Sequence, residues 1–202
     1  MDGIDFALAA YREEGVWQVQ ELTHDHLVDI DTLAHALRRF PGDGGAVGMV
    51  AIDEDFFVIV RVAGPTTRVL LSDVTAADEW ELAGSAVDFL HLPMPEDEDE
   101  QAPAGDLDLL HDMGIPAMDM GILLDDLDLY PDEMLSDVAR RVGFGEQFDD
   151  DLNQRPLPPA TTFDAAVTVP LRFGLAATAR VENLFNELVV SGISSSGTID
   201  RA

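Results

Sequence analysis

The sequence predicts an α+β fold: an antiparallel sheet of about five strands with two helices, followed by a small all-helical unit. Two apolar runs at residues 46–52 and 56–62 are joined only by Asp53-Glu54-Asp55. That connection is too short for a parallel crossover, so the two strands must be antiparallel neighbours. Up to residue 92 the patterns run in the order strand, strand, helix, three strands, helix, and only helix patterns occur from residue 106 to residue 152.

The first part of the sheet is a predicted hairpin with a helix after it. Residues 4–11 alternate, with Phe6, Leu8 and Ala10 on one face, residues 12–15 indicate a turn, and residues 16–22 indicate a second strand. Asp29 or Asp31 can cap a helix that ends at Pro41-Gly42. Its apolar side chains recur at helical spacing, at Leu33, Ala36, Leu37 and Phe40. We expect these side chains to pack on the hairpin.

The centre of the sheet is predicted at residues 46–52 and 56–62. Both runs are apolar at nearly every position, which is typical of strands covered on both faces. A turn at residues 63–67 leads into a strand at residues 68–71, and Ser72 or Asp73 can cap a second helix. That helix carries Trp80, Leu82 and Ala83.

Shifts in composition divide the chain into four parts. The sheet domain spans residues 1–92, and residues 93–105 form an acidic linker, because consecutive carboxylates repel one another and cannot bury apolar area. The helical unit spans residues 106–152. Its helices are expected near residues 107–110, 116–127 and 131–142, and they should pack on the sheet or on a partner, because short helices are unstable alone. Residues 153–202 form a neutral, partly disordered tail.

Two helices of these later parts have distinct patterns. Residues 131–142 begin with Pro131, carry acids in the first turn and arginines in the last, and are followed by Gly143, which together indicate both helix ends. The tail contains one amphipathic helical stripe, made of Val181, Leu184, Phe185, Leu188 and Val189.

The formal net charge of −29 lies entirely in residues 1–152. Those residues hold 36 acidic and 7 basic side chains, whereas residues 153–202 hold four of each. A strongly anionic surface repels phosphate backbones and attracts cationic surfaces. We therefore expect no direct binding of nucleic acid, and a partner with a basic surface.

Two absences exclude further classes of protein. Cysteine is missing, which removes disulfides, thiolate metal sites and a cysteine nucleophile. No apolar run approaches the ~20 residues of a membrane-spanning helix, and the start at Met1-Asp2-Gly3 lacks the basic residues of a secretory signal. We expect a cytoplasmic protein without membrane contact. No pattern in the sequence indicates an oligomeric state.

No catalytic residue, cofactor site or metal site is predicted. His24-Asp25-His26 is the densest histidine cluster, and exposed polar histidines before a helix are its simplest interpretation. Asp125-Asp126-Leu127-Asp128 resembles the start of a calcium loop but lacks the turn glycine and the closing glutamate. Carboxylate pairs such as Asp106 and Asp108 arise without purpose in a chain with 40 acidic residues.

Three motifs of the helical unit carry a family resemblance. They are Gly105-Asp106-Leu107-Asp108-Leu109-Leu110, Tyr130-Pro131-Asp132-Glu133-Met134-Leu135, and Ala139-Arg140-Arg141-Val142-Gly143-Phe144-Gly145. In these motifs, and in the layout of hairpin, helix, strand pair and acidic linker before them, the chain resembles the actinobacterial tRNA adenosine deaminase-associated protein family. The resemblance covers about residues 4–152, and the tail departs from it. It implies a tRNA adenosine deaminase as partner and implies no catalytic residues.

The leading hypothesis is a non-catalytic, acidic accessory protein that binds or regulates a tRNA adenosine deaminase. The chain offers no zinc deaminase site of its own, because that site needs thiolate ligands. The candidate partner-binding residues are Glu96, Asp97, Glu98, Asp99, Glu100, Asp125, Asp126 and Asp128. Two alternatives stay open: a nucleic-acid mimic that competes with tRNA for a basic surface, and an enzyme that uses carboxylates and a divalent metal.

Overall fold

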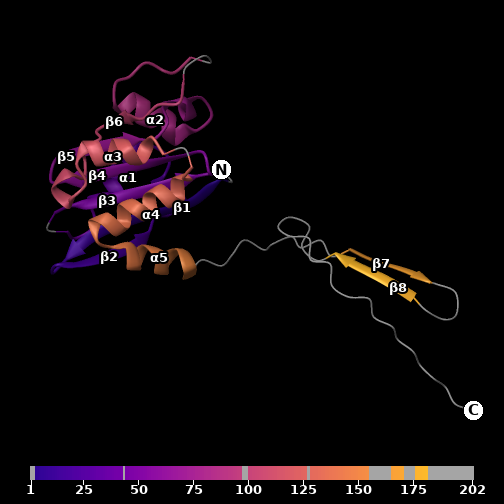
Figure 1. The fold of residues 1–202 in the computed structure, drawn as a ribbon. Helices are drawn as coiled ribbons and strands as arrows, with labels where there is room; N and C mark the ends of the chain where they lie inside the picture. The colour runs from indigo at the N-terminus through magenta and orange to yellow at the C-terminus, as the bar shows by residue number, and fades with distance from the viewer. Residues whose placement is uncertain are drawn as a thin grey trace, which may run out of the picture. The chain divides into compact units, whose positions relative to one another are not determined.

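The computed structural model describes residues 3–42, 44–96, 100–126, 128–154, 165–170 and 176–181. The chain divides into two compact units, Met1–Arg155 and Pro156–Ala202. The first unit contains a six-stranded antiparallel sheet with helices on both faces (Figure 1). The predicted α+β fold is confirmed.

The sheet has the strand order β2-β1-β3-β4-β5-β6, and every neighbouring pair is antiparallel. β3 and β4 lie in its centre, and every residue of β3 is buried, as the unbroken apolar runs predict. The strands are β1 (Ile4–Glu13), β2 (Val16–Glu21), β3 (Ala46–Ile52), β4 (Phe56–Ala63), β5 (Thr66–Leu71) and β6 (Ala104–Gly105).

The sixth strand comes from the end of the predicted linker. β6 pairs with Leu70 and Leu71 of β5, and Ala104 is buried there. The backbone N–H of Val74 donates to the Ala102 carbonyl (2.8 Å), which holds the preceding residues against the sheet. The sequence does not predict this strand, because two residues are too few to show a strand pattern. The acidic run at residues 96–100 also makes the whole segment read as a linker.

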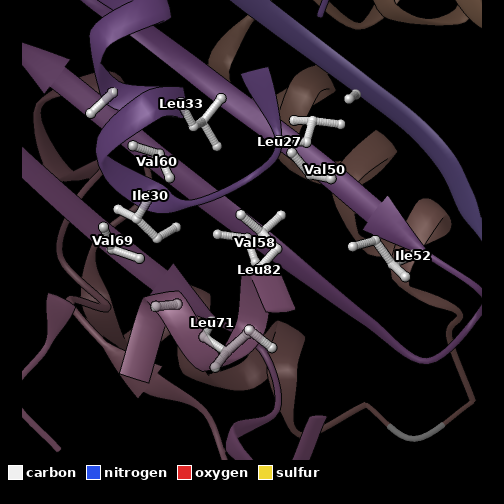
Figure 2. Close-up of a cluster of buried hydrophobic side chains, with 14 of the residues drawn as sticks. Leu27, Ile30, Leu33, Val50, Ile52, Val58, Val60, Val69, Leu71 and Leu82 are labelled. Carbon is white, nitrogen blue, oxygen red and sulfur yellow. The ribbon is translucent and has the colours of Figure 1, made fainter. Parts of the chain in front are cut away.

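One face of the sheet is covered by α1 (Ile30–Leu37) and α2 (Glu81–Phe89). Short 3-10 helices, η1 (His24–His26) and η2 (Val74–Asp78), precede them. Asp29 caps α1, accepting a hydrogen bond from the Thr32 N–H at 2.6 Å. Figure 2 shows side chains of α1, among them Leu33, lying against valines of β3 and β4.

The position of α1 corrects one prediction in part. The helix lies mainly over β3 and β4. Of the predicted contacts with the hairpin, Phe40 beyond the end of the helix stacks on Tyr11 of β1, with ring centroids 5.1 Å apart. Gly48 explains the position over β3 and β4, because it presents no side chain beneath the helix: a Cβ built there would lie 3.0 Å from Leu37 Cδ1. The absence of a side chain lets α1 approach the sheet centre closely.

The other face of the sheet is covered by the helical unit. It consists of η3 (His111–Met113), α3 (Ala117–Leu124), α4 (Pro131–Val142) and α5 (Gly145–Gln154). A second core joins sheet residues such as Phe6, Met49 and Ile59 to the helix residues Leu135 and Phe148. The rings of Phe6 and Phe148 meet edge to face, with centroids 5.1 Å apart. Of the two expected positions for these helices, on the sheet or on a partner, the structure has the first.

Two local features differ from the sequence prediction. Residues 107–110 form turns before η3 rather than a helix. The helix α5, which contacts β2, was not predicted, since its acidic side chains leave a weak apolar pattern around Phe148. α4 agrees with the prediction at both ends, and Gly143 follows it at φ 105°.

The second unit contains the antiparallel strands β7 (Ala165–Pro170) and β8 (Ala176–Val181). The helical stripe expected in this region begins at Val181, which instead ends β8, and its residues Leu184, Phe185, Leu188 and Val189 lie outside the described residues. None of the helices described is both long and apolar enough to cross a membrane.

The turn before β3 depends on a glycine. Gly45 has φ +82°, and a Cβ at this position would overlap the backbone carbonyl of Val62 on β4. Gly64 also has a positive φ, of +56°, but a Cβ there would meet nothing within 4 Å. A substitution at Gly64 therefore introduces backbone strain alone, whereas a substitution at Gly45 introduces the same strain together with a steric clash.

We expect Gly64→Ala to lower the free energy of unfolding by about 1–2 kcal/mol, the cost of a left-handed non-glycine residue. Gly45→Ala should lower it by more, because the same strain is joined by the clash with β4. Urea unfolding of both variants measures the difference. Equal effects at the two positions would contradict this account of the β3–β4 edge.

Candidate functional site

Acidic residues from separate segments meet at the end of the sheet where β3 turns into β4. The turn residues Asp53, Glu54 and Asp55 are all exposed. Asp53 and Glu54 have positive φ values of 50° and 56°, which non-glycine residues seldom adopt. Backbone N–H groups anchor the turn to the start of the chain: Asp53 donates to the Gly3 carbonyl (2.6 Å) and Glu54 to Asp5 Oδ2 (3.1 Å).

A cleft of about 550 Å³ lies beside this turn, and we call it the acidic cleft. Residues 54–55 of the turn, residues 101–103 before β6, and the α3–α4 connection line it. Its carboxylates belong to Glu54, Asp55, Asp73, Asp125 and Asp126. Apolar and aromatic side chains, including Phe57, Leu124, Tyr130 and Met134, line it as well. The acidic cleft therefore combines negative charge with apolar surface.

A smaller hollow of about 340 Å³ continues the acidic surface. It shares Asp55 with the acidic cleft and is also lined by Asp78, Glu79 and Glu96. The structure thus places carboxylates of the β3–β4 turn, of η2 and of the linker around two adjoining hollows.

The structure brings only some of the predicted partner-binding residues together. Asp125 and Asp126 line the acidic cleft, and Glu96 lines the smaller hollow. Glu100 and Asp128 are exposed but line neither hollow. Asp97, Glu98 and Asp99 lie outside the described residues.

Sequence reasoning missed Glu54, Asp55, Asp73 and Tyr130 as members of this surface. The triplet at residues 53–55 was visible as a charged turn between two buried strands. What the sequence does not show is that the α3–α4 connection folds back beside that turn.

Four of the described arginines form ion pairs elsewhere. The pairs are Arg61–Asp112, Arg68–Asp106 (3.5 Å), Arg140–Asp149 (3.9 Å) and Arg141–Asp137 (2.7 Å). In the part of the chain that the structure describes, no ion pair joins an arginine to a carboxylate of the acidic cleft. The cleft consequently presents negative charge that a cationic group from outside can neutralise.

The carboxylate pair Asp106 and Asp108 has structural contacts. Asp106 Oδ1 accepts the backbone N–H of Asp108 (2.9 Å), and Asp106 Oδ2 faces Arg68. Asp108 Oδ1 accepts the N–H of Ala117 at 3.1 Å, at the start of α3. These bonds shape the loop before α3.

Among the described residues, no three His, Asp or Glu side chains are grouped so that they could hold a metal ion. His24 and His26 lie in η1, where His26 Nδ1 is 3.4 Å from the Thr23 N–H.

One buried cation fastens the helical unit to the sheet. Arg61 on β4 is 4% exposed, and its guanidinium donates to the Leu109 carbonyl (2.9 Å). It also forms a two-pronged ion pair with Asp112 of η3, in which Nη2 lies 2.6 Å from Oδ2. The hydrogen bond from Arg61 holds the pKa of Asp112 below its ordinary value of 3.8.

Comparison with known proteins gives the family of the chain. Residues 5–145 match the family described as Rv3753c-like tRNA adenosine deaminase-associated protein, and the chain belongs to that family. A relative in Mycobacterium tuberculosis (strain ATCC 25618 / H37Rv), Protein Rv3753c, is 40% identical over 145 residues, which cover 70% of this chain and 84% of the relative. No solved structure matches the chain. The predicted family resemblance is confirmed.

Removing the exposed carboxylate that pairs with the buried Arg61 should destabilise the fold. Asp112→Ala leaves Arg61 buried with a single carbonyl acceptor, so we expect the free energy of unfolding to fall by about 1–3 kcal/mol. Adding Arg61→Met removes the unpaired charge and should recover part of that loss. Urea unfolding measures Asp112→Ala, Arg61→Met and the double variant. Asp137→Ala is a control that breaks a surface pair for about 0.5 kcal/mol. Simple addition of the two single effects would contradict the pairing.

The same pair predicts a contribution to stability that depends on pH. Because the pKa of Asp112 is lower in the folded state than in the unfolded chain, the contribution is complete above the unfolded pKa and is lost as the pH falls through the folded pKa. The difference in unfolding free energy between the wild type and Arg61→Met/Asp112→Ala should therefore shrink between about pH 5 and pH 3. A difference that is constant with pH would show that Asp112 does not titrate against Arg61.

Proposed function

We propose that this protein is a non-catalytic accessory protein that binds a tRNA adenosine deaminase through its acidic surface. The observation that carries the proposal is the acidic cleft, whose carboxylates have no arginine partner among the described residues. The family description supplies the class of partner.

The charge of the partner follows from its substrate. A protein that binds tRNA contacts phosphates with lysine and arginine, and so carries a basic surface. A chain with a net charge of −29 is attracted to such a surface over long distances. Complementary charge mainly accelerates encounter and fixes orientation.

A non-catalytic role in deamination agrees with the side chains that the chain carries. The zinc site of nucleobase deaminases uses thiolate ligands together with histidine and a glutamate. This chain has no cysteine. Its carboxylates are suited to contacting cations on a partner.

Binding should be strong at low salt and should weaken as salt is added. We expect the purified protein to retain the tRNA adenosine deaminase of the same organism in a pull-down. Neutralising the cleft with Glu54→Gln, Asp55→Asn, Asp125→Asn and Asp126→Asn should weaken the affinity about tenfold, equivalent to about 1.4 kcal/mol.

A control variant keeps the total charge the same as in the cleft variant. It carries Glu13→Gln, Glu14→Gln, Glu146→Gln and Asp150→Asn, all exposed residues that line neither hollow. We expect it to bind nearly as well as the wild type. Equal weakening by both variants would mean that net charge, and not the acidic cleft, governs association. No association at any ionic strength would refute the proposed function.

A second candidate function is mimicry of nucleic acid. Exposed carboxylates around two adjoining hollows can occupy the basic surface that tRNA phosphates need. In that case the added protein should raise the apparent Kd of the deaminase for tRNA, as measured by fluorescence anisotropy. An unchanged Kd in the presence of bound protein would leave the accessory role and eliminate mimicry.

A further inference from the structure

The helix α3 is apolar on both its inner and its outer side. Met120 and Leu123 are buried against the sheet. Met118 and Ile122 are 77% and 65% exposed, which makes them the two most exposed large apolar side chains among the described residues. They lie four residues apart, so they are neighbours on one side of the helix. A helix on the surface normally carries polar residues on its outer side.

The C-terminal end of α3 carries uncompensated negative charge. Asp125 is the C-cap residue and Asp126 follows it, and the last turn contains no basic residue. The carbonyl end of a helix is itself partially negative, so aspartates there are unfavourable and a cation is favourable. α4 has the opposite arrangement, with acids in its first turn and arginines in its last. The last turn of α4 therefore has basic residues to balance its carbonyl end, whereas the last turn of α3 has none.

The apolar residues and the charges form one continuous surface. Positions 118, 122 and 125 recur at helical spacing, so Met118, Ile122 and Asp125 lie along one side of α3. Asp125 and Asp126 then line the acidic cleft, together with Tyr130. A cleft with carboxylates and a tyrosine suits a guanidinium or ammonium group, through ion pairs and a cation–π contact.

Charge decides which kind of molecule can cover this surface. A second copy of this chain would bring its own acidic surface toward these aspartates, and phosphate groups of nucleic acids or lipids are repelled by the same field. A protein segment with apolar side chains beside arginine or lysine matches both parts of the surface.

We propose that the outer side of α3 is the apolar anchor of the docking surface, and that it seats a basic amphipathic segment of the partner. This inference rests on the proposed function and locates its contact: the partner's apolar side chains cover Met118 and Ile122, and one of its cationic side chains enters the acidic cleft. Apolar anchors at the centre of an interface provide most of the affinity, whereas charges at the rim provide orientation.

The first experiment measures affinity for the tRNA adenosine deaminase. Met118→Gln/Ile122→Gln removes the apolar anchor without changing charge, and it should weaken binding at least about tenfold while leaving the circular dichroism spectrum and the Tm unchanged. The control Val16→Gln/Val28→Gln changes two other exposed apolar residues, at 56% and 48% exposure, and should bind like the wild type.

The effect of salt separates the two parts of the surface. The affinity of the α3 variant should keep the salt dependence of the wild type, because its charges are intact. Asp125→Asn/Asp126→Asn should instead reduce that dependence. If the α3 variant binds the deaminase as tightly as the wild type while the aspartate variant is weakened, the proposed function stands and the anchor is refuted.

The second experiment is independent of the deaminase. Two synthetic helical peptides of equal positive charge serve as probes, one with leucines spaced four residues apart between arginines, the other with serines in their place. We expect the leucine peptide to bind more tightly and to shift the amide NMR signals of α3 and the α3–α4 connection. Equal binding of both peptides, or shifts confined to other elements, would overturn the anchor even if the deaminase itself does not bind.

Discussion

The structure depends on a sheet whose two faces are both apolar. β3 is buried along its whole length, so neither of its faces can be left to water. Helices α1 and α2 cover one face and α3–α5 cover the other. Because the helical unit must reach the second face, the α3–α4 connection arrives beside the β3–β4 turn. The acidic cleft is a consequence of this requirement for burial.

Positive and negative charges have different places in this fold: several arginines pair within it, whereas most carboxylates of the acidic cleft face solvent. Four of the seven arginines of the acidic body form ion pairs within the fold. Arg61 is the clearest case, since it is buried and joins β4 to η3. Ion pairs on exposed residues add little to stability. Among the described residues, no ion pair joins an arginine to a carboxylate of the acidic cleft. The fold thus presents its negative charge where an outside cation can reach it.

An element was predictable when the sequence pattern that marks it lies within its own residues, and was missed when it depends on contacts with distant residues. The central strands and α4 were predicted well, because an unbroken apolar run and a complete set of end signals are contained in their own residues. β6 and α5 were missed, because each is stabilised by contacts with distant residues: β6 by Leu70 and Leu71, and α5 by Phe6 and β2. The position of α1 was predicted only in part: Phe40 does meet Tyr11 of β1, but the place of the helix over β3 and β4 depends on the space above Gly48.

The candidate site shows the same division. The sequence by itself determined the anionic character of the chain, the absence of thiolate chemistry, the α+β class and the identity of Asp125 and Asp126 as candidates, since all of these follow from composition and local pattern. Only the tertiary structure decided that these aspartates meet Glu54, Asp55 and Tyr130 in one cleft, and that Met118 and Ile122 stay exposed beside them. The physical reason is that the pleat and the helical period fix which side a residue faces, whereas packing of the whole sheet fixes what it faces.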